Sequence, residues 1–284
     1  MPSTPSNSPV WNNELLKHPH DAADKRQRVQ KMFAAIAPSY DLNNRLHSLW
    51  MDQAWRRKAV KLAGLKPADT VMDVACGTGD LTLKFARRLD QLRPAGETRS
   101  ARRGQVIGVD FTYEMLPLAR DKADTIILRN LSHAASALGD VAISLGHTIV
   151  WINADALSLP LESTSADVLS IAFGIRNVAD PAAAIREFHR LLRPGGRLII
   201  LEFSLPTNPL LRALYNFYFR KILPRTATLI SRDKTGAYKY LPESVNTFIN
   251  RQTMMKMMTD AGFHDVTQHP MTFGVCVCYR GIKP

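Results

Sequence analysis

Short apolar runs alternate with amphipathic stretches through most of this chain. The runs are rich in Val, Ile and Leu, a composition typical of strands that are buried on both faces of a sheet. They cover residues 71–75, 105–110, 147–153, 166–173 and 197–203. Patterns with helical spacing follow the first two runs, at residues 80–89 and 113–122. This repetition of strand and helix predicts βαβ units, whose strands lie parallel.

The segment after residue 180 carries the clearest helix signals in the chain. Asp180 is a favourable N-cap residue, Pro181 suits the first turn, and Ile185 and Phe188 fall on one apolar face. The sequence RPGG at residues 193–196 then ends the helical pattern. We therefore expect a helix that packs one face against the predicted sheet.

Two further apolar runs near the C-terminus complete the expected sheet. Residues 266–272 and 275–281 are predicted to pair antiparallel at one edge. The expected fold class is α/β, with one mostly parallel, seven-stranded, Rossmann-like sheet and helices on both faces. We expect a flexible N-terminal tail at residues 1–28 and a single domain at 29–284, with insertions near 89–104 and 123–146.

The composition is that of an ordinary globular protein, but the charge needs an explanation. With 284 residues, 45% of them hydrophobic and 22% charged, the chain is neither disordered nor a coiled-coil rod. Lys and Arg number 37 against 25 Asp and Glu, a net charge of +12. A balance this basic favours polyanionic partners, either nucleic acid or an anionic membrane surface.

Cysteine content and apolar run lengths set further limits. Cys76, Cys276 and Cys278 are too few and too badly spaced for a disulfide framework or a complete zinc site, so no metal is expected. No apolar run reaches the roughly 18 residues that a membrane span needs. The first residues resemble neither a secretion signal nor an Arg-rich transit peptide, and we expect a cytoplasmic protein.

A glycine loop marks the first candidate site. Asp73 lies in the first predicted strand, and Gly77, Thr78 and Gly79 follow it ahead of a helix, where open α/β sheets bind ligands. The glycines let the backbone approach a ligand, and the helix N-terminus favours its anionic part. Thr82 replaces the third glycine of a dinucleotide fingerprint. Asp73 suits the ammonium group of an amino-acid cofactor better than a pyrophosphate.

Further candidates stand at the ends of the next two strands. Asp110 ends the second strand, where a carboxylate can accept hydrogen bonds from both hydroxyls of a ribose. Together with Asp73, this favours S-adenosylmethionine over NAD as the cofactor. Asn153 and Ala154 follow the third strand, in position to contact an adenine edge, although an Asx turn is the alternative interpretation.

Arg176 and Asn177 follow the fourth strand in the run FGIRNV. We expect both side chains to project into the same crevice, since parallel strands end at one edge of the sheet. A guanidinium there can stabilise an oxyanion, and an amide can orient a hydroxyl or carbonyl group. The alternative for Arg176 is an ion pair with a structural carboxylate.

Several of these segments resemble a known family. VMDVACGTGDLT, IGVD, NADALSLP, FGIRNV and REFHRLLRPGGRLIILEFSLP, with MFAAIAPSYDLNNRL upstream, closely resemble the UbiE/COQ5/MenG family from about residue 32 to the C-terminus. Members of this family are class I methyltransferases that use S-adenosylmethionine to C-methylate the ring in ubiquinone and menaquinone biosynthesis. The resemblance therefore implies the same fold, cofactor and reaction here.

The resemblance also implies roles for individual residues. The implied cofactor-binding residues are Asp73, Gly77, Thr78, Asp110, Asn153 and Ala154. Tyr40 and Asp41 match a tyrosine-aspartate pair that lies over the site in the family. Arg176, Asn177 and Tyr40 are the implied catalytic residues. Because a guanidinium stays protonated, we expect Arg176 to stabilise a quinolate while Asn177 and Tyr40 orient the ring.

The implied substrate is a reduced, polyprenylated quinone, methylated at a ring carbon beside a hydroquinone oxygen. The lack of a transit peptide favours a bacterial protein and demethylmenaquinol over the benzoquinol of ubiquinone biosynthesis. Residues 205–224 interleave Leu, Tyr and Phe with Arg212, Arg220 and Lys221, which suits a polyprenyl tail at an anionic membrane surface. A helix packed on the sheet with solvated basic residues is the alternative.

We therefore expect peripheral contact with the inner face of a membrane and no nucleic acid, and we leave a homodimer open. Two other classes of function also stay open. A nucleic-acid methyltransferase would suit the charge, but FGIRNV stands where a DPPY-like or NPPF-like motif would be needed. A noncatalytic binding subunit would keep the fold, but the intact cofactor positions argue against it.

Overall fold

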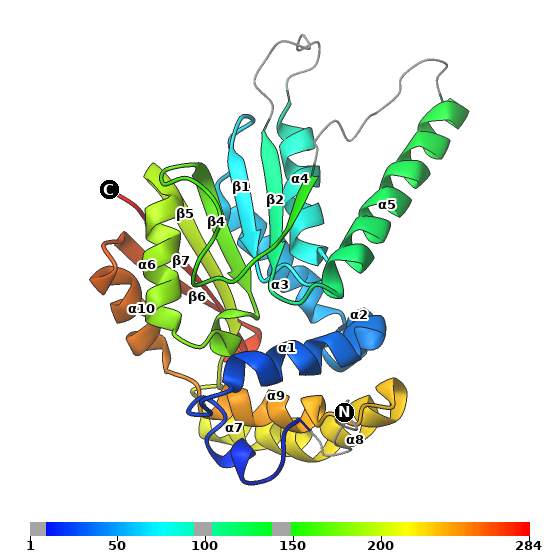
Figure 1. The fold of residues 1–284 in the computed structure, drawn as a ribbon, viewed down its shortest axis with the longest axis vertical. Helices are drawn as coiled ribbons and strands as arrows, with labels where there is room; N and C mark the ends of the chain where they lie inside the picture. The colour runs from blue at the N-terminus through cyan, green and yellow to red at the C-terminus, as the bar shows by residue number, and fades with distance from the viewer. Residues whose placement is uncertain (1–9, 94–103, 138–148) are drawn as a thin grey trace, which may run out of the picture.

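Seven strands pair into one sheet in the order β3-β2-β1-β4-β5-β7-β6. This computed structural model describes residues 10–93, 104–137 (the backbone alone from 127) and 149–284 (Figure 1). The strands are β1 (Thr70–Val74), β2 (Gln105–Asp110), β3 (Ile149–Asn153), β4 (Ala166–Ala172), β5 (Leu192–Phe203), β6 (His264–Met271) and β7 (Cys276–Ile282). Strands β1 to β5 are parallel, and β7 runs antiparallel to both of its neighbours. The predicted α/β class and mostly parallel sheet are confirmed.

The central strands are buried because their side chains alternate between two apolar layers. In β1, Val71 packs against one layer, and Met72 and Val74 pack against the other. The first layer is built on α3 (Met51–Ala63) and α4 (Asp80–Leu92), and the second on α6 (Pro181–Leu191) and α10 (Arg251–Asp260). The expected helices on both faces are therefore present.

Strand β5 is longer than its apolar pattern predicts. It begins at Leu192, directly after α6, because the RPGG segment at 193–196 continues as extended chain. An irregularity in the pairing of β4 with β5 absorbs the extra residues, and the N–H of Gly195 donates to the carbonyl of Lys283 at 2.9 Å. The RPGG segment thus follows the end of α6, as predicted, and also forms the first part of β5.

A further layer of helices lies across the carboxyl edge of the parallel strands (Figure 1). We call it the cap. Its helices are α1 (Lys25–Ile36), α2 (Tyr40–His47), α7 (Pro209–Phe217), α8 (Leu223–Ser231) and α9 (Ala237–Asn246), with a π-helical turn at Tyr218–Ile222 between α7 and α8. A third apolar cluster holds these helices together, with Met32, Phe219 and Tyr240 among its buried members. Helices that precede β1 and helices that follow β5 thereby form one cover over the strand ends.

The predicted tail at residues 1–28 is wrong from residue 10 onward. Trp11 is 1% exposed, and its ring stacks on Tyr240 of α9 with centroids 4.4 Å apart. The backbone N–H of Trp11 donates to the carbonyl of Thr235 at 3.0 Å, and α1 already begins at Lys25. The polar sequence around Trp11 concealed this, because the apolar surface that Trp11 covers comes from residues more than 200 positions away.

The two predicted insertions fall partly outside the described residues. Near 89–104, α4 continues through Leu92, and residues 94–103 lie outside the described part. Near 123–146, α5 (Met115–Ala137) occupies the first half as a helix, and residues 138–148 lie outside. No helix within the described ranges is long and apolar enough to cross a membrane.

Candidate active site

The glycine loop leaves β1 through a backbone conformation that few side chains tolerate. Ala75 has φ of +52°, and Gly77 and Gly79 have φ of +56° and +79°. A Cβ at Gly79 would lie 2.8 Å from the ring of Trp151, so glycine is also required there by space. The N–H of Gly77 donates to Oδ2 of Asp110 at 2.7 Å, which ties the loop to the end of β2.

The loops after β1 and β4 separate at the point where the strand order reverses. A Cβ at Gly174 would lie 2.6 Å from Cβ of Ala75, so the two chains touch as they leave the sheet. Phe173, just before Gly174, also has positive φ, +57°. Ligands of open α/β sheets bind in the crevice at such a switch point. We call the pocket found here the first pocket.

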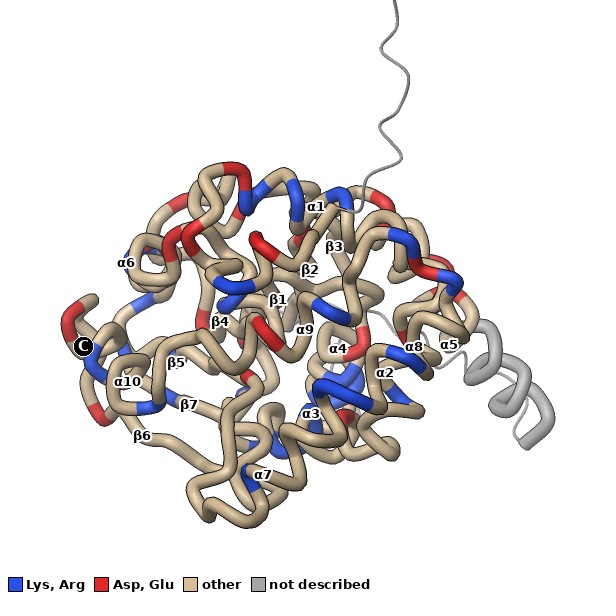
Figure 2. The backbone as a smooth tube through the Cα atoms, turned by 90° about the horizontal axis from the view of Figure 1, so that it is seen from below, with Lys and Arg blue, Asp and Glu red and all other residues tan. Residues whose placement is uncertain are grey.

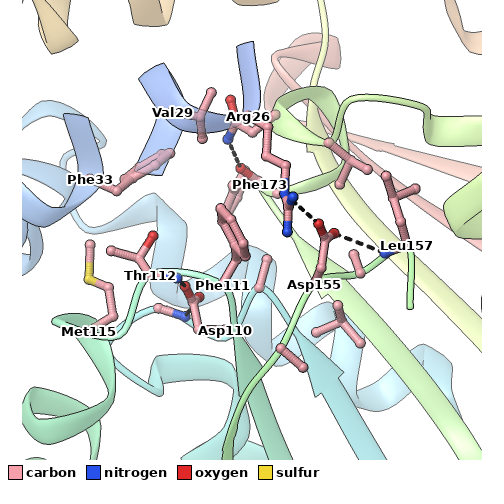
Figure 3. Close-up of a pocket in the computed structure, with 18 of the residues that line it drawn as sticks. Arg26, Val29, Phe33, Asp110, Phe111, Thr112, Met115, Asp155, Leu157 and Phe173 are labelled. Atoms are coloured by element: carbon pink, nitrogen blue, oxygen red, sulfur yellow. Dashed lines mark hydrogen bonds and ion pairs between the residues drawn. The ribbon is translucent and has the colours of Figure 1, made fainter. Parts of the chain in front are cut away.

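The first pocket draws its walls from the carboxyl ends of β1 to β4 and from α1 (Figure 3). Asp110 faces it with a carboxylate that accepts from the N–H of Gly77 and, at 2.8 Å, from the N–H of Thr112. Burial raises the pKa of Asp110 to about 6. Ala154 and Ala156 line the same pocket with small side chains, which leave room for a flat ring.

Helix α1 closes the first pocket from above. Arg26 donates to Oδ2 of Asp155 at 2.8 Å, and its guanidinium lies 4.6 Å from the ring centre of Phe111 (Figure 3). Gln30 adds a hydrogen bond to the carbonyl of Phe111 at 3.4 Å. Sequence analysis missed Arg26 and Asp155 as wall residues. The helical spacing of apolar residues around Val29 in α1 was the available signal, since it indicates that one face of this helix packs on the rest of the protein.

Three predicted cofactor residues have protein partners and do not line the first pocket. Asp73 accepts from Thr82 Oγ1 and Ser170 Oγ, both at 2.6 Å, and so joins β1, α4 and β4. Burial raises its pKa to about 6. Asn153 uses its amide to hold the carbonyl of Asp110 at 2.9 Å.

Thr78 is the third of these residues. Its hydroxyl donates to Oδ1 of Asp41 at 2.6 Å and accepts from Nζ of Lys122 at 3.0 Å. Lys122 also contacts Asp80 at 2.8 Å, so α2, α4 and α5 meet in one ionic cluster. The hydrogen bonds of Thr78 thereby fix the glycine loop against α2, the helix that begins with Tyr40.

A second pocket adjoins the first across a wall that both share. Phe33, Tyr40 and Phe173 line both pockets. The second pocket adds Phe203, whose ring centre lies 4.6 Å from that of Phe173, and Tyr240. An aromatic enclosure of this kind suits a planar, apolar ring, since aromatic faces and edges stack favourably on one another. Burial raises the pKa of Tyr40, so its hydroxyl stays protonated.

Arg176 lines the second pocket, and Asn177 lines the first. Arg176 is an ion-pair partner of a buried carboxylate, the alternative considered above: its Nη1 lies 2.6 Å from Oε1 of Glu202. The same nitrogen donates to the carbonyl of Phe173 at 2.7 Å, and Nε donates to Ser244 at 3.3 Å. Oδ1 of Asn177 accepts from the hydroxyl of Tyr240 at 3.0 Å, which positions it at the junction of the pockets.

A third pocket continues from the second into the cap. The two share five wall residues, Asn44, Ser48, Phe203, Tyr238 and Leu241. Beyond them the third pocket runs along Tyr215, Tyr218 and Leu223, between α2 and the segment that joins α7 to α8. The three pockets thus form a row that extends from the glycine loop to the cap.

The fold and the crevice define the class of protein. A solved S-adenosylmethionine-dependent methyltransferase from Aquifex aeolicus has a similar fold, with a TM-score of 0.50, 19% identity, and coverage of 81% of this chain and 89% of that one. Phosphoethanolamine N-methyltransferase 2 of Haemonchus contortus, solved with phosphomonomethylethanolamine and S-adenosylhomocysteine, has a TM-score of 0.51 at 14% identity, covering 81% and 52%. The architecture is therefore that of the S-adenosylmethionine-dependent methyltransferases.

The chain belongs to the ubiE/COQ5 methyltransferase family, whose sequence profile matches residues 21–283. The ubiquinone/menaquinone biosynthesis C-methyltransferase UbiE of Geobacter sp. strain M21 is 40% identical over 261 residues, 92% of this chain and 98% of the relative. UbiE of Pseudomonas fluorescens strain Pf0-1 is 38% identical over 262 residues, covering 92% and 91%. The resemblance, the class I fold and S-adenosylmethionine as cofactor are confirmed.

Removal of Arg176 is expected to destabilise the fold, because it leaves the buried Glu202 without its counter-charge. Unpairing a buried ion pair costs about 3–5 kcal/mol. Arg176→Leu should lose about this much in urea denaturation. Arg176→Leu combined with Glu202→Gln should recover most of it, since the glutamine still accepts from the N–H of Phe203. Equal stability of Arg176→Leu and the unmodified protein would contradict a structural role for this pair.

Proposed function

We propose that this protein transfers a methyl group from S-adenosylmethionine to a ring carbon of a reduced, polyprenylated quinone, with demethylmenaquinol as the preferred acceptor. The observation that carries this proposal is the row of three pockets. The crevice at the glycine loop, which Arg26, Asp110 and Asp155 line with charged groups, adjoins an aromatic enclosure, and that enclosure shares a wall with a third pocket in the cap. This order matches a cofactor, a ring and a polyprenyl tail.

The residues of the first pocket fit the cofactor. Asp110 has the carboxylate that a ribose diol needs, Gly77 allows close approach of the backbone, and Ala154 leaves space beside an adenine. Asp73, Thr78 and Asn153 support this site through the loops that they hold in place. When bound, S-adenosylmethionine supplies an electrophilic methyl group on a sulfonium ion.

The second pocket fits the acceptor ring. Only the reduced quinol, or its phenolate, makes the ring carbon nucleophilic, and an aromatic enclosure keeps water away from that carbon. The protonated hydroxyl of Tyr40 and the amide of Asn177 orient the ring at the boundary of the first two pockets. The permanent charge of Arg176 adds positive potential, since its guanidinium lies 5.4 Å from the ring centre of Phe203 in the same wall.

The cap suits peripheral contact with an anionic membrane. Leu210, Leu214 and Phe217 are 78%, 65% and 60% exposed and fall on one face of α7 by their spacing. Between residues 205 and 239 the chain carries seven basic residues and one acidic residue. Figure 2 views the molecule from the side of this layer, with Lys and Arg in blue. Exposed apolar side chains among basic ones are typical of surfaces that bind anionic lipid.

The reaction is tested with methyl-labelled S-adenosylmethionine and each reduced quinone in detergent. We expect label in the naphthoquinol product, at a higher rate than in the matched 2-methoxy-6-polyprenylbenzoquinol. The preference would be contradicted by faster labelling of the benzoquinol. Label in neither lipid, but in added RNA, would overturn the proposal in favour of a nucleic-acid methyltransferase.

Cofactor affinity should depend on pH through Asp110. Its ionised form is the better acceptor for two ribose hydroxyls, so bound cofactor favours loss of the proton. Affinity should therefore be full above the pKa of about 6 and fall as the pH is lowered through it, by up to about tenfold per pH unit. Calorimetric titration with S-adenosylhomocysteine from pH 5 to 8 measures this. Asp110→Asn should bind more weakly and lose this pH dependence, and an unchanged profile in that variant would exclude Asp110.

Membrane contact is tested by sedimentation with vesicles. Binding to vesicles rich in anionic phosphatidylglycerol should exceed binding to neutral phosphatidylcholine, and added salt should weaken it. Leu214→Ser with Phe217→Ser should reduce vesicle binding at least about tenfold, because each apolar side chain contributes about 1.5–3 kcal/mol when buried. Tyr113→Ser and Phe273→Ser provide the control, since these residues are 63% and 79% exposed but lie outside the cap. Equal loss in both variants would refute a specific cap surface.

A further inference from the structure

The second pocket holds a buried cation that the proposed mechanism does not use. Arg56, on α3, is 7% exposed and lines the pocket. Its guanidinium carbon lies 5.0 Å from the ring centre of Phe173, the residue shared by the first two pockets. Within the described part of the chain, its Nε and Nη1 atoms are buried and have no hydrogen-bond partner. Buried donors without an acceptor are costly, about 1–3 kcal/mol each and more for a charged group.

Asp52 carries the counter-charge of Arg56 but accepts no hydrogen bond from these donors. Oδ2 of Asp52 lies 3.9 Å from Nη1 of Arg56, close enough for an ion pair but too far for a hydrogen bond. The carboxylate of Asp52 accepts instead from Oγ of Ser48 at 3.0 Å and from Nε2 of Gln53 at 2.9 Å. Asp52 thus balances the charge of Arg56 without using its N–H groups.

Arg56 and Arg176 therefore differ in the capacity that they offer a ligand. Nε and Nη1 of Arg176 donate to Ser244, Phe173 and Glu202. The corresponding atoms of Arg56, in the wall of the same pocket, donate to none of the described residues. An oxygen atom on a ring in this pocket would supply the acceptor that Arg56 lacks.

We propose that Arg56 is a catalytic residue that binds a ring oxygen of the acceptor as an anion, through its free N–H donors. The proposal rests on the proposed function for the identity of the ring. The O–H bond of the bound hydroxyl breaks, its proton passes to water, and the electron pair stays on the oxygen facing Arg56. The phenolate donates electron density into the ring, which makes the adjacent carbon a stronger nucleophile. The guanidinium holds the negative charge on the oxygen.

Other ionisable groups face Arg56 from several elements. Asp52 and Lys84 lie on α3 and α4, Asp80 begins α4, Asp73 lies in β1, Tyr40 begins α2, and Cys276 begins β7. Burial alone would raise the pKa of Asp80, but the charges of Arg56 and Lys122 lower it to about 2. Asp80 therefore stays ionised across the working range. Asp73, with a pKa of about 6, also ionises within that range under the influence of Arg56, so the test must read the ionisation of the bound hydroxyl itself.

The test uses Arg56→Met, with Arg57→Met as a matched control, since Arg57 is the exposed neighbour on the same helix. A first measurement follows the ionisation of bound 4-nitrophenol by absorbance, with and without S-adenosylhomocysteine. A positive charge close to the oxygen of a bound phenol lowers the pKa of that phenol by about one to two. This lowering should occur in the unmodified protein and in Arg57→Met, and be lost in Arg56→Met.

A second measurement is turnover with the reduced quinone. Arg56→Met should lower it about 100-fold, the size expected for loss of an oxyanion donor, while the affinity for S-adenosylhomocysteine changes less than about twofold. If Arg56→Met unfolds, Arg56→Met with Asp52→Asn removes both charges and is measured in its place. Arg56→Lys should recover part of the ionisation effect, because lysine restores the positive charge but not the planar set of N–H donors of a guanidinium.

Each of these measurements either supports or contradicts a role for Arg56. A folded Arg56 variant in which bound 4-nitrophenol ionises as in the unmodified protein would overturn the proposal, as would a lack of 4-nitrophenol binding to the unmodified protein. Failure of the quinone proposal is a separate outcome. In that case neither quinol is methylated, but bound 4-nitrophenol still has a lowered pKa when Arg56 is present and an ordinary pKa when Arg56 is replaced.

Discussion

The close approach of β1 and β4 at the switch point is the constraint on which the rest of the site depends. Ala75 and Phe173 both leave their strands with positive φ, and Gly174 has no space for a side chain beside Ala75. Such conformations cost about 1–3 kcal/mol each and persist only where the surrounding structure enforces them. Here they turn the two loops apart, which opens the first pocket and directs Phe173 into the wall that separates it from the second.

Two buried guanidinium groups in one pocket wall have different tasks. Arg176 binds other buried groups of the protein. It pairs with Glu202 and donates to the carbonyl of Phe173, so it stabilises the turn after β4. Among the described residues, Nε and Nη1 of Arg56 have no acceptor, while Asp52 balances its charge. An arginine whose N–H donors have protein acceptors stabilises the pocket wall, whereas one whose donors lack acceptors can still donate hydrogen bonds to a ligand. This distinction arises from hydrogen-bond geometry alone.

The cap places exposed apolar side chains beside the third pocket. Exposed apolar side chains lie on α7 and α8, which carry Arg212 and Arg225, while Arg220 and Lys221 lie in the turn between them. The third pocket leads from the aromatic enclosure into the cap and away from the glycine loop. With seven basic residues and one acidic residue, the segment 205–239 contributes about half of the net charge of +12.

The sequence by itself determined the sheet, the glycine loop and the family, because these depend on local pattern and on contiguous motifs such as FGIRNV. Asp110, Gly77, Ala154 and Asn177, predicted from their positions after strand ends, and Tyr40, predicted from the family resemblance, all line the first pocket. Only the tertiary structure decided the burial of Trp11, the pairing of Arg176 with Glu202 and the free donors of Arg56. Each depends on partners from distant parts of the chain, and local sequence carries no signal for whether a buried polar group finds a partner.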